Sequence, residues 1–141
     1  METFLRLRDI DKHFPGVHAL KEVNFELNKG ECVALLGENG AGKSTLIKVL
    51  GGAHRPDSGE IWLGGKEMFF EKPTDSLAAG IAIIYQEFNL VPGLSVVENI
   101  FLGIEPHDYG WARREDENRR AKEVLQRIGA TIGIGKRCDE L

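Results

Sequence analysis

Hydrophobic and polar residues alternate in two segments near the start of the chain. Residues 4–8 and 23–27 repeat with a period of two, which predicts two half-buried strands. The sequence Phe14-Pro15-Gly16 lies between them and predicts a turn. The apolar run at 31–36 is continuous rather than alternating, which predicts a buried central strand.

Short apolar runs separated by turn signals continue to residue 85. They predict a helix at 44–50, followed by a hairpin of 61–63 with 68–70. A short helix comes next, which Thr74 or Asp75 caps and Gly80 ends. A buried strand is predicted at 81–85. The first part of the chain therefore predicts a mixed sheet with helices.

The pattern becomes helical after residue 86. Ser95 and Glu98 have the spacing of a capping box, which predicts a helix from 95 to about 102. A loop that contains His107 leads into a second helix. Its apolar stripe has the spacing i, i+3, i+4, i+7 and ends before Gly129; the members are Ala121, Val124, Leu125 and Ile128.

The chain has 141 residues and a formal net charge of −4, with 42% hydrophobic and 28% charged residues. These values are typical of one modest globular domain. The acidic balance argues against a basic footprint for nucleic acid. No segment has the ~20 apolar residues that cross a bilayer. Cys32 and Cys138 match no zinc or disulfide spacing, which favours a reduced, cytosolic protein.

Two sets of reactive side chains have simple structural interpretations. Cys32 lies in the run at 31–36, so we expect a core residue rather than a nucleophile. The histidines are spread along the sequence and match no metal-ligand or triad spacing, so we expect solvated or packing roles. They are His13, His18, His54 and His107.

The chemistry is concentrated in the segment 37–45. Its sequence is Gly37-Glu38-Asn39-Gly40-Ala41-Gly42-Lys43-Ser44-Thr45, which matches the P-loop pattern between a predicted strand and a predicted helix. Glycines let successive N–H groups converge on one anion, and the helix N-terminus adds unpaired amides. Lys43 would reach the β- and γ-phosphates, and the Ser44 hydroxyl would bind Mg²⁺. The alternative is a flexible glycine turn with a solvated lysine.

Together with three other segments, this motif resembles the ATP-binding subunits of ABC transporters, and among them the bacterial sugar importers. Residues 37–45 are similar to the Walker A motif, 83–90 to the Q-loop, 12–20 to the A-loop and 99–103 to the helical stretch that follows. The resemblance implies an α/β fold. It comprises a P-loop NTPase core with an N-terminal antiparallel β subdomain over 1–94, and the start of a helical subdomain over 95–141, truncated before Walker B.

The resemblance also implies roles for individual residues. Phe14 would stack on the adenine of ATP, and the whole segment 37–45 would bind its phosphates. Lys43 and Gln86 would be the catalytic residues, and Ser44 and Gln86 would bind Mg²⁺. Residues 87–94 would receive a cytoplasmic helix of the membrane-spanning partner.

At the level of the whole protein, the resemblance implies ATP hydrolysis coupled to sugar import. The partners would be membrane-spanning permease subunits and a second ATPase domain, in a homodimer or a tandem pair, with a sugar-binding protein involved indirectly and no nucleic acid. The protein would be cytoplasmic and peripheral on the inner face of the cell membrane.

The family's Walker B strand, signature motif and switch histidine are not found in the sequence, and Leu141 would fall at or just before the signature motif. We therefore expect this chain to bind Mg-ATP weakly without hydrolysing it. We also expect a sheet edge that is open to pairing between copies. Two alternatives stay open: a soluble ABC-type ATPase of DNA repair or translation, and a P-loop kinase or GTPase.

Overall fold

The computed structural model describes residues 3–85, 89–104, 107–108, 111–112 and 114–141. The chain forms two compact units, Met1–Ile84 and Tyr85–Leu141, and each is described by itself. The division into a nucleotide-binding core over 1–94 and a helical part over 95–141 stays a prediction. Of the helices in the described residues, none combines the length and apolar character needed to cross a membrane.

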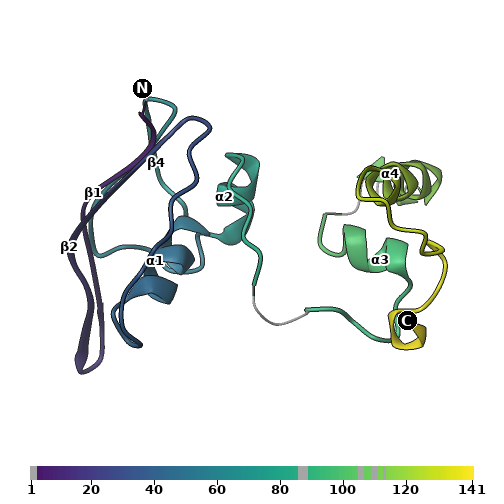
Figure 1. The fold of residues 1–141 in the computed structure, drawn as a ribbon, viewed down its shortest axis with the longest axis horizontal. Helices are drawn as coiled ribbons and strands as arrows, with labels where there is room; N and C mark the ends of the chain where they lie inside the picture. Colours follow the sequence, from purple (N-terminus) through teal and green to yellow (C-terminus); the bar gives the residue numbers. More distant parts are fainter. Residues whose placement is uncertain (1–2, 86–88, 105–106, 109–110, 113) are drawn as a thin grey trace. The chain divides into compact units, whose positions relative to one another are not determined.

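A four-stranded antiparallel sheet forms one side of the first unit (Figure 1). Its order is β2-β1-β3-β4, and its strands are β1 (Thr3–Phe14), β2 (Val17–Asn28), β3 (Ser58–Leu63) and β4 (Lys66–Met68). The predicted strands at 4–8 and 23–27 and the turn between them are therefore confirmed. The hairpin around Gly64-Gly65 is also confirmed, although its second strand begins earlier than predicted.

The core lies between this sheet and helix α1 (Lys43–Leu50). Its fully buried side chains are Leu7, Ile10 and Val49. Leu7 and Ile10 are three positions apart, yet both are buried, because β1 has a register shift between them. Asp9, within the shift, has a φ of 48°, the local distortion that a β-bulge introduces.

Helix α2 (Pro73–Ala78) begins two or three residues earlier than a cap at Thr74 or Asp75 would place it. Lys72 is the N-cap residue, so the predicted caps Thr74 and Asp75 are wrong as caps. Asp75 lies in the first turn, and its carboxylate accepts hydrogen bonds from the amides of Glu71 (3.1 Å) and Lys72 (3.2 Å). The carboxylate thus accepts from the amides of the two residues that precede the helix, which is the role of the acidic residue in a capping box.

The two predicted buried strands at 31–36 and 81–85 are not strands in the structure. Leu36 is 87% exposed and Ile84 is 99% exposed. A strand is stabilised by hydrogen bonds to neighbouring strands, and in the described part of the chain neither segment has a strand beside it. Cys32 is exposed for the same reason, so its predicted core position is wrong.

The second unit is mainly helical, as predicted. It contains α3 (Val96–Phe101), the paired two-residue strands β5 (His107–Asp108) and β6 (Trp111–Ala112), α4 (Arg114–Arg127) and the 3₁₀ turn η1 (Cys138–Glu140). The paired strands β5 and β6 lie where a loop was predicted around His107.

The capping box at the start of α3 is confirmed. The Ser95 amide donates to Glu98 Oε2 (2.8 Å), and the Glu98 amide donates to Ser95 Oγ (3.4 Å). The predicted apolar stripe of α4 is only partly buried. Ala121 is completely buried, whereas Ile128 is 71% exposed and lies beyond the last residue of the helix.

Candidate functional site

The glycine-rich segment leads directly into α1. The Ala41 amide donates to the Glu38 carbonyl (3.2 Å) and closes a turn, and Gly42, with a φ of 85°, is the N-cap of the helix. The Leu46 amide makes the first helical bond, to the Gly42 carbonyl (2.9 Å). Within the described residues, the amides of Lys43, Ser44 and Thr45 have no protein acceptor, so they can donate to an anion.

The Lys43 side chain folds back over the loop that precedes it. Its Nζ donates to the carbonyl oxygens of Gly37 (2.7 Å) and Glu38 (2.6 Å). The ammonium group is therefore held beside the loop backbone rather than extended into solvent. An anion on the loop could receive the lysine and the helix amides together, because both belong to the same short segment.

Strand β2 determines where this loop lies. A Cβ atom on Gly42 would overlap the carbonyl oxygen of Ala19 and would lie 2.9 Å from Leu20 Cδ2. Gly40 has the same φ of 85°, yet nothing lies within 4 Å of the corresponding position. Gly42 is therefore required for close packing as well as for its backbone conformation. The predicted role of the glycines, which was conformational freedom, did not include this contact.

The oxygen-bearing residues of the segment differ in exposure. Ser44 is exposed, so its hydroxyl is accessible to a ligand, whereas Thr45 is half-buried in the first turn of α1. The loop residues before Gly42 are also exposed. Gln86, the other residue predicted to bind Mg²⁺, lies outside the described residues.

Phe14 is at the tip of the hairpin formed by β1 and β2, where it pairs with Val17. Its ring lies edge-on to His54, with centroids 5.2 Å apart, and the Lys12 ammonium is 5.7 Å from its centroid. Val17 is two residues from Ala19, which contacts Gly42, and two residues of strand span about 7 Å. The hairpin thus brings an aromatic ring into the neighbourhood of the loop.

A cluster that sequence analysis missed lies one residue from Phe14. The rings of His13 and His18 stack with centroids 3.7 Å apart, and His18 Nε2 is 2.6 Å from Asp11 Oδ1. The stacking of these two rings agrees with the packing role expected for the histidines, but their contact with each other and with Asp11 was not predicted. The two residues of the turn, Pro15-Gly16, were the available signal, because such a turn places residues 13 and 18 opposite each other.

Asp57 joins this hairpin to the loop after α1. Its carboxylate accepts from Lys12 Nζ (2.7 Å) and from the His13 amide (2.6 Å). The bond from Lys12 is the main cause that holds the pKa of the Asp57 carboxyl below its usual value. We therefore expect a charged Asp57 at neutral pH, attached to the strand that carries Phe14.

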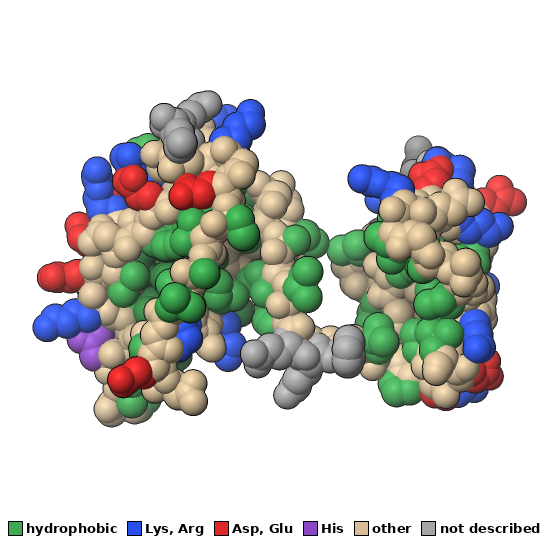
Figure 2. Space-filling model, viewed as in Figure 1, with side chains coloured by type: hydrophobic (Ala, Val, Ile, Leu, Met, Phe, Trp, Pro, Cys, Tyr) green, Lys and Arg blue, Asp and Glu red, His purple; other side chains and the backbone are tan. Residues whose placement is uncertain are grey.

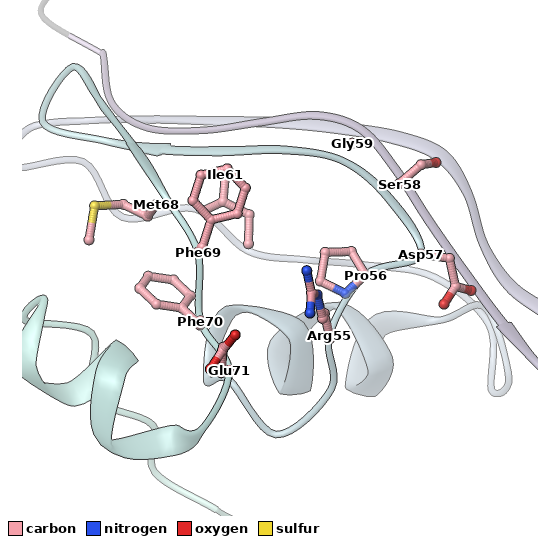
Figure 3. Close-up of a pocket in the computed structure, with 10 residues that line it drawn as sticks. All are labelled: Arg55, Pro56, Asp57, Ser58, Gly59, Ile61, Met68, Phe69, Phe70 and Glu71. Carbon is pink, nitrogen blue, oxygen red and sulfur yellow. The ribbon is translucent and has the colours of Figure 1, made fainter.

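Asp57 also lines a pocket of about 320 Å³ between the β3–β4 hairpin and the loop after α1 (Figure 3). Apolar side chains that include Ile61, Met68 and Phe69 line part of it, and Arg55 and Glu71 add opposite charges. None of the described candidate residues between 37 and 45 lines this pocket, so it is separate from the glycine-rich loop.

Comparison with known proteins identifies the family. A family model described as ABC transporter matches residues 20–140. The chain belongs to the ABC transporter family. The match includes the whole segment 37–45 and begins after Phe14.

Several relatives within the ABC transporter family are named for sugar import. The arabinose import ATP-binding protein AraG of Vibrio parahaemolyticus is 54% identical over 127 residues, which is 90% of this chain and 25% of the relative. The ribose import ATP-binding protein RbsA 1 of Streptomyces avermitilis is 51% identical over 140 residues, which is 99% of this chain and 27% of the relative. This chain thus spans about a quarter of the length of these curated relatives.

Solved structures confirm the fold class, an ABC ATPase-type P-loop fold. A nucleotide-free ATP-binding cassette from an ABC transporter has a TM-score of 0.83 and 28% identity, over 99% of this chain and 59% of that one. A dimeric bacterial ABC transporter cassette has a TM-score of 0.72 and 26% identity, over 97% of this chain and 62% of that one.

Proposed function

We propose that this chain is the ATP-binding part of an ABC transporter ATPase that couples ATP binding and hydrolysis to sugar import. The observation that carries the proposal is that the Lys43 ammonium and the free amides of the first turn of α1 lie in one short segment, where both can bind the same anion. The names of the relatives, which concern arabinose and ribose import, support a sugar as the transported substrate.

Phosphate binding follows from the charges at the loop. The first turn of α1 offers its amides and the positive end of the helix dipole to the polyphosphate chain. Lys43 would exchange its bonds to the carbonyls of Gly37 and Glu38 for bonds to phosphate oxygens. That exchange is favourable, because a bond between two charged groups is stronger than one between an ammonium and a neutral carbonyl.

The residues also fit Mg²⁺ and adenine. The exposed Ser44 hydroxyl is a hard oxygen donor, the type that Mg²⁺ prefers, and Gln86 stays the second predicted ligand. Bound Mg²⁺ would neutralise charge on the phosphates. Phe14, with 36% of its surface exposed, would stack on the adenine ring. Compared with a tyrosine at this position, phenylalanine keeps the aromatic face and lacks the hydroxyl group.

The resemblance extends the proposal to partners. We infer membrane-spanning permease subunits and a second ATPase domain, in a homodimer or a tandem pair, with a sugar-binding protein involved indirectly and no nucleic acid. The dimeric solved cassette supports pairing between ATPase domains. The protein would act at the inner face of the cytoplasmic membrane.

Hydrolysis needs groups that this sequence does not contain, namely the Walker B carboxylates and the signature motif. Lys43 and Gln86 would contribute to phosphoryl transfer only with those groups in place, because the reaction depends on positioning and charge stabilisation. We therefore infer that the 141-residue chain binds Mg-ATP and does not turn it over.

Calorimetric titration of the chain with Mg-ATP tests the binding proposal. Lys43→Ala should weaken affinity about 10- to 150-fold, because a hydrogen bond to a charged group contributes about 1.5–3 kcal/mol. Lys48→Ala is a matched control, since Lys48 is an exposed lysine in the last turn of the same helix. Its affinity should equal that of the wild type.

Two results would contradict the proposal. One is the absence of binding heat from wild-type chain whose amide NMR spectrum is well dispersed. The other is an equal loss of affinity in both lysine variants.

A separate assay of phosphate release addresses turnover, and steady release above the Lys43→Ala background would overturn the inference that the chain does not hydrolyse ATP. Competition with GTP distinguishes an ATPase from a GTPase.

A further inference from the structure

Three side chains near the tip of the β1–β2 hairpin form a compact group. His13 and His18 face each other across the antiparallel pair, with near-parallel rings at 19°. Asp11 Oδ1 is 2.6 Å from His18 Nε2. One nitrogen or oxygen atom from each of the three residues lies within 4.8 Å of the other two.

The backbone and two further contacts hold this group in place. Asp11 Oδ2 accepts a hydrogen bond from the Glu22 amide (3.2 Å), which leaves Oδ1 directed at His18. On the other side, Asp57 Oδ2 is 3.5 Å from His13 Nδ1 and accepts from the His13 amide (2.6 Å). Carboxylates that contact a histidine in this way orient metal ligands in proteins.

We propose that Asp11, His13 and His18 bind a divalent transition-metal ion of the zinc class. Two imidazoles and one carboxylate suit Zn²⁺, Co²⁺ or Ni²⁺, whereas Mg²⁺ and Ca²⁺ prefer sites made of oxygen atoms alone. This site is separate from the Mg²⁺ that would accompany ATP, because it shares no residue with the loop at 37–45.

Only side-chain adjustments are needed to admit the ion. Ligand atoms around tetrahedral Zn²⁺ are about 3.3 Å apart, given bonds of about 2.0–2.1 Å. The ligand atoms now lie within 4.8 Å of one another, and Asp11 and His18 would separate from their present 2.6 Å as the ion takes the place of the hydrogen-bonding proton, which is released to solvent. The backbone register across the hairpin already brings the three residues together.

Accessibility and local charge also permit binding. The side chains of Asp11, His18 and His13 are 18%, 34% and 58% exposed, so the ion can enter and water can complete its coordination. Lys12 carries a positive charge next to the cluster, and its ammonium is paired with Asp57 at 2.7 Å. This ion pair reduces the repulsion that Lys12 would exert on a bound cation.

The test is a titration of the tag-free 141-residue chain with ZnCl₂ at pH 7.5. Cys32→Ser and Cys138→Ser are introduced first, because both thiols are free and would compete for zinc. We expect one ion per chain by calorimetry. His18→Gln should weaken the affinity at least tenfold, and His54→Gln, the matched control outside the cluster, should leave it unchanged.

A second readout needs no change to the cluster. In long-range ¹H–¹⁵N NMR spectra, zinc should shift the imidazole nitrogens of His13 and His18 and leave those of His54 in place. The proposal is overturned if zinc does not bind with one-to-one stoichiometry, if His18→Gln binds as tightly as its parent, or if the His54 signals shift instead. ATP is absent from the experiment, so the result does not depend on the proposed nucleotide site.

Discussion

The N-terminus of α1 packs so closely on β2 that a Cβ atom on Gly42 would overlap the carbonyl oxygen of Ala19. The candidate phosphate loop is thereby attached to the hairpin that carries Phe14 at its tip. The contact between Gly42 and Ala19 therefore connects the candidate phosphate loop to the hairpin that carries the candidate adenine-stacking residue, Phe14.

A comparison of Gly42→Ala with Gly40→Ala tests this contact. Both glycines have a φ of 85°, so each substitution incurs the left-handed backbone penalty of about 1–2 kcal/mol. Gly42→Ala should lower the free energy of unfolding by about 1–3 kcal/mol more, because its methyl group has no room. Urea denaturation measures the difference. Equal effects of the two substitutions would argue against the packing role of Gly42.

Phe14 should contribute to ATP affinity through its aromatic face. Stacking of a base on an aromatic ring contributes about 1–3 kcal/mol, so Phe14→Ala should weaken Mg-ATP binding about 5- to 150-fold. Phe14→Tyr should retain the affinity, since it keeps the ring. Phe69→Ala is the control, because Phe69 is 73% exposed and lines the pocket away from the loop. Similar losses in both alanine variants would contradict a specific role for Phe14.

Asn99 should stabilise the start of the second unit. Its side chain accepts from the Val91 amide (2.8 Å) and donates to the carbonyls of Val91 (3.1 Å) and Ser95 (3.1 Å). Asn99→Ala leaves these groups without that partner, at a cost of about 1–3 kcal/mol. Asn118→Ala, on an exposed position of α4, should cost much less. Hydrogen exchange of the Val91 amide reports the change, and unchanged protection in Asn99→Ala would refute the assignment.

The capping box of α3 should weaken in acid. The hydrogen bond from the Ser95 hydroxyl is the main cause that lowers the pKa of the Glu98 carboxyl from 4.5. A lowered pKa means that the carboxylate stabilises the folded state above about pH 4.5, and that this stabilisation is lost as pH falls through the lower folded value.

The amide NMR signals of Ser95 and Glu98 are a local measure of this effect. They should move toward unfolded positions as pH falls below about 4.5 in the wild type. Glu98→Gln has no carboxyl group at this position, so its signals should not show this titration. The same titration in Glu98→Gln would assign the effect to another group.

The exposed apolar segments should promote self-association. Leu36 is 87% and Ile84 99% exposed, and hydrophobic side chains are visible on the surface of the first unit (Figure 2). Exposed apolar patches favour contacts between copies. Leu36→Lys combined with Ile84→Lys should lower the average mass measured by light scattering at high concentration. Phe4→Lys is the control and should have a smaller effect, because Phe4 is only 45% exposed. A mass independent of all these changes would reject this explanation.

Features whose partners are close together in the chain were predictable from sequence. Ser95 and Glu98 satisfy each other within one helical turn, and the spacing of Gly37, Gly42 and Lys43 specifies a turn followed by a helix. The N-cap of α2 was assigned to Thr74 or Asp75, whereas it is Lys72. Asp75 instead accepts hydrogen bonds from the two amides that precede the helix.

Features that depend on distant partners were predicted less well. The apolar runs at 31–36 and 81–85 have strand-like composition, but composition does not supply the neighbouring strand that a ladder requires. The contact between His13 and His18 was not predicted, because it depends on the register of two strands.

The sequence by itself determined the phosphate-loop motif, the β1–β2 and β3–β4 hairpins and the capped start of α3, because each arises from hydrogen bonds and backbone preferences within a few residues. Only the tertiary structure decided that Gly42 packs on Ala19, that Asp11 meets His13 and His18, and that Cys32 is exposed. These outcomes depend on which segments lie side by side, and that arrangement is set by the packing of the sheet against α1 rather than by any local pattern.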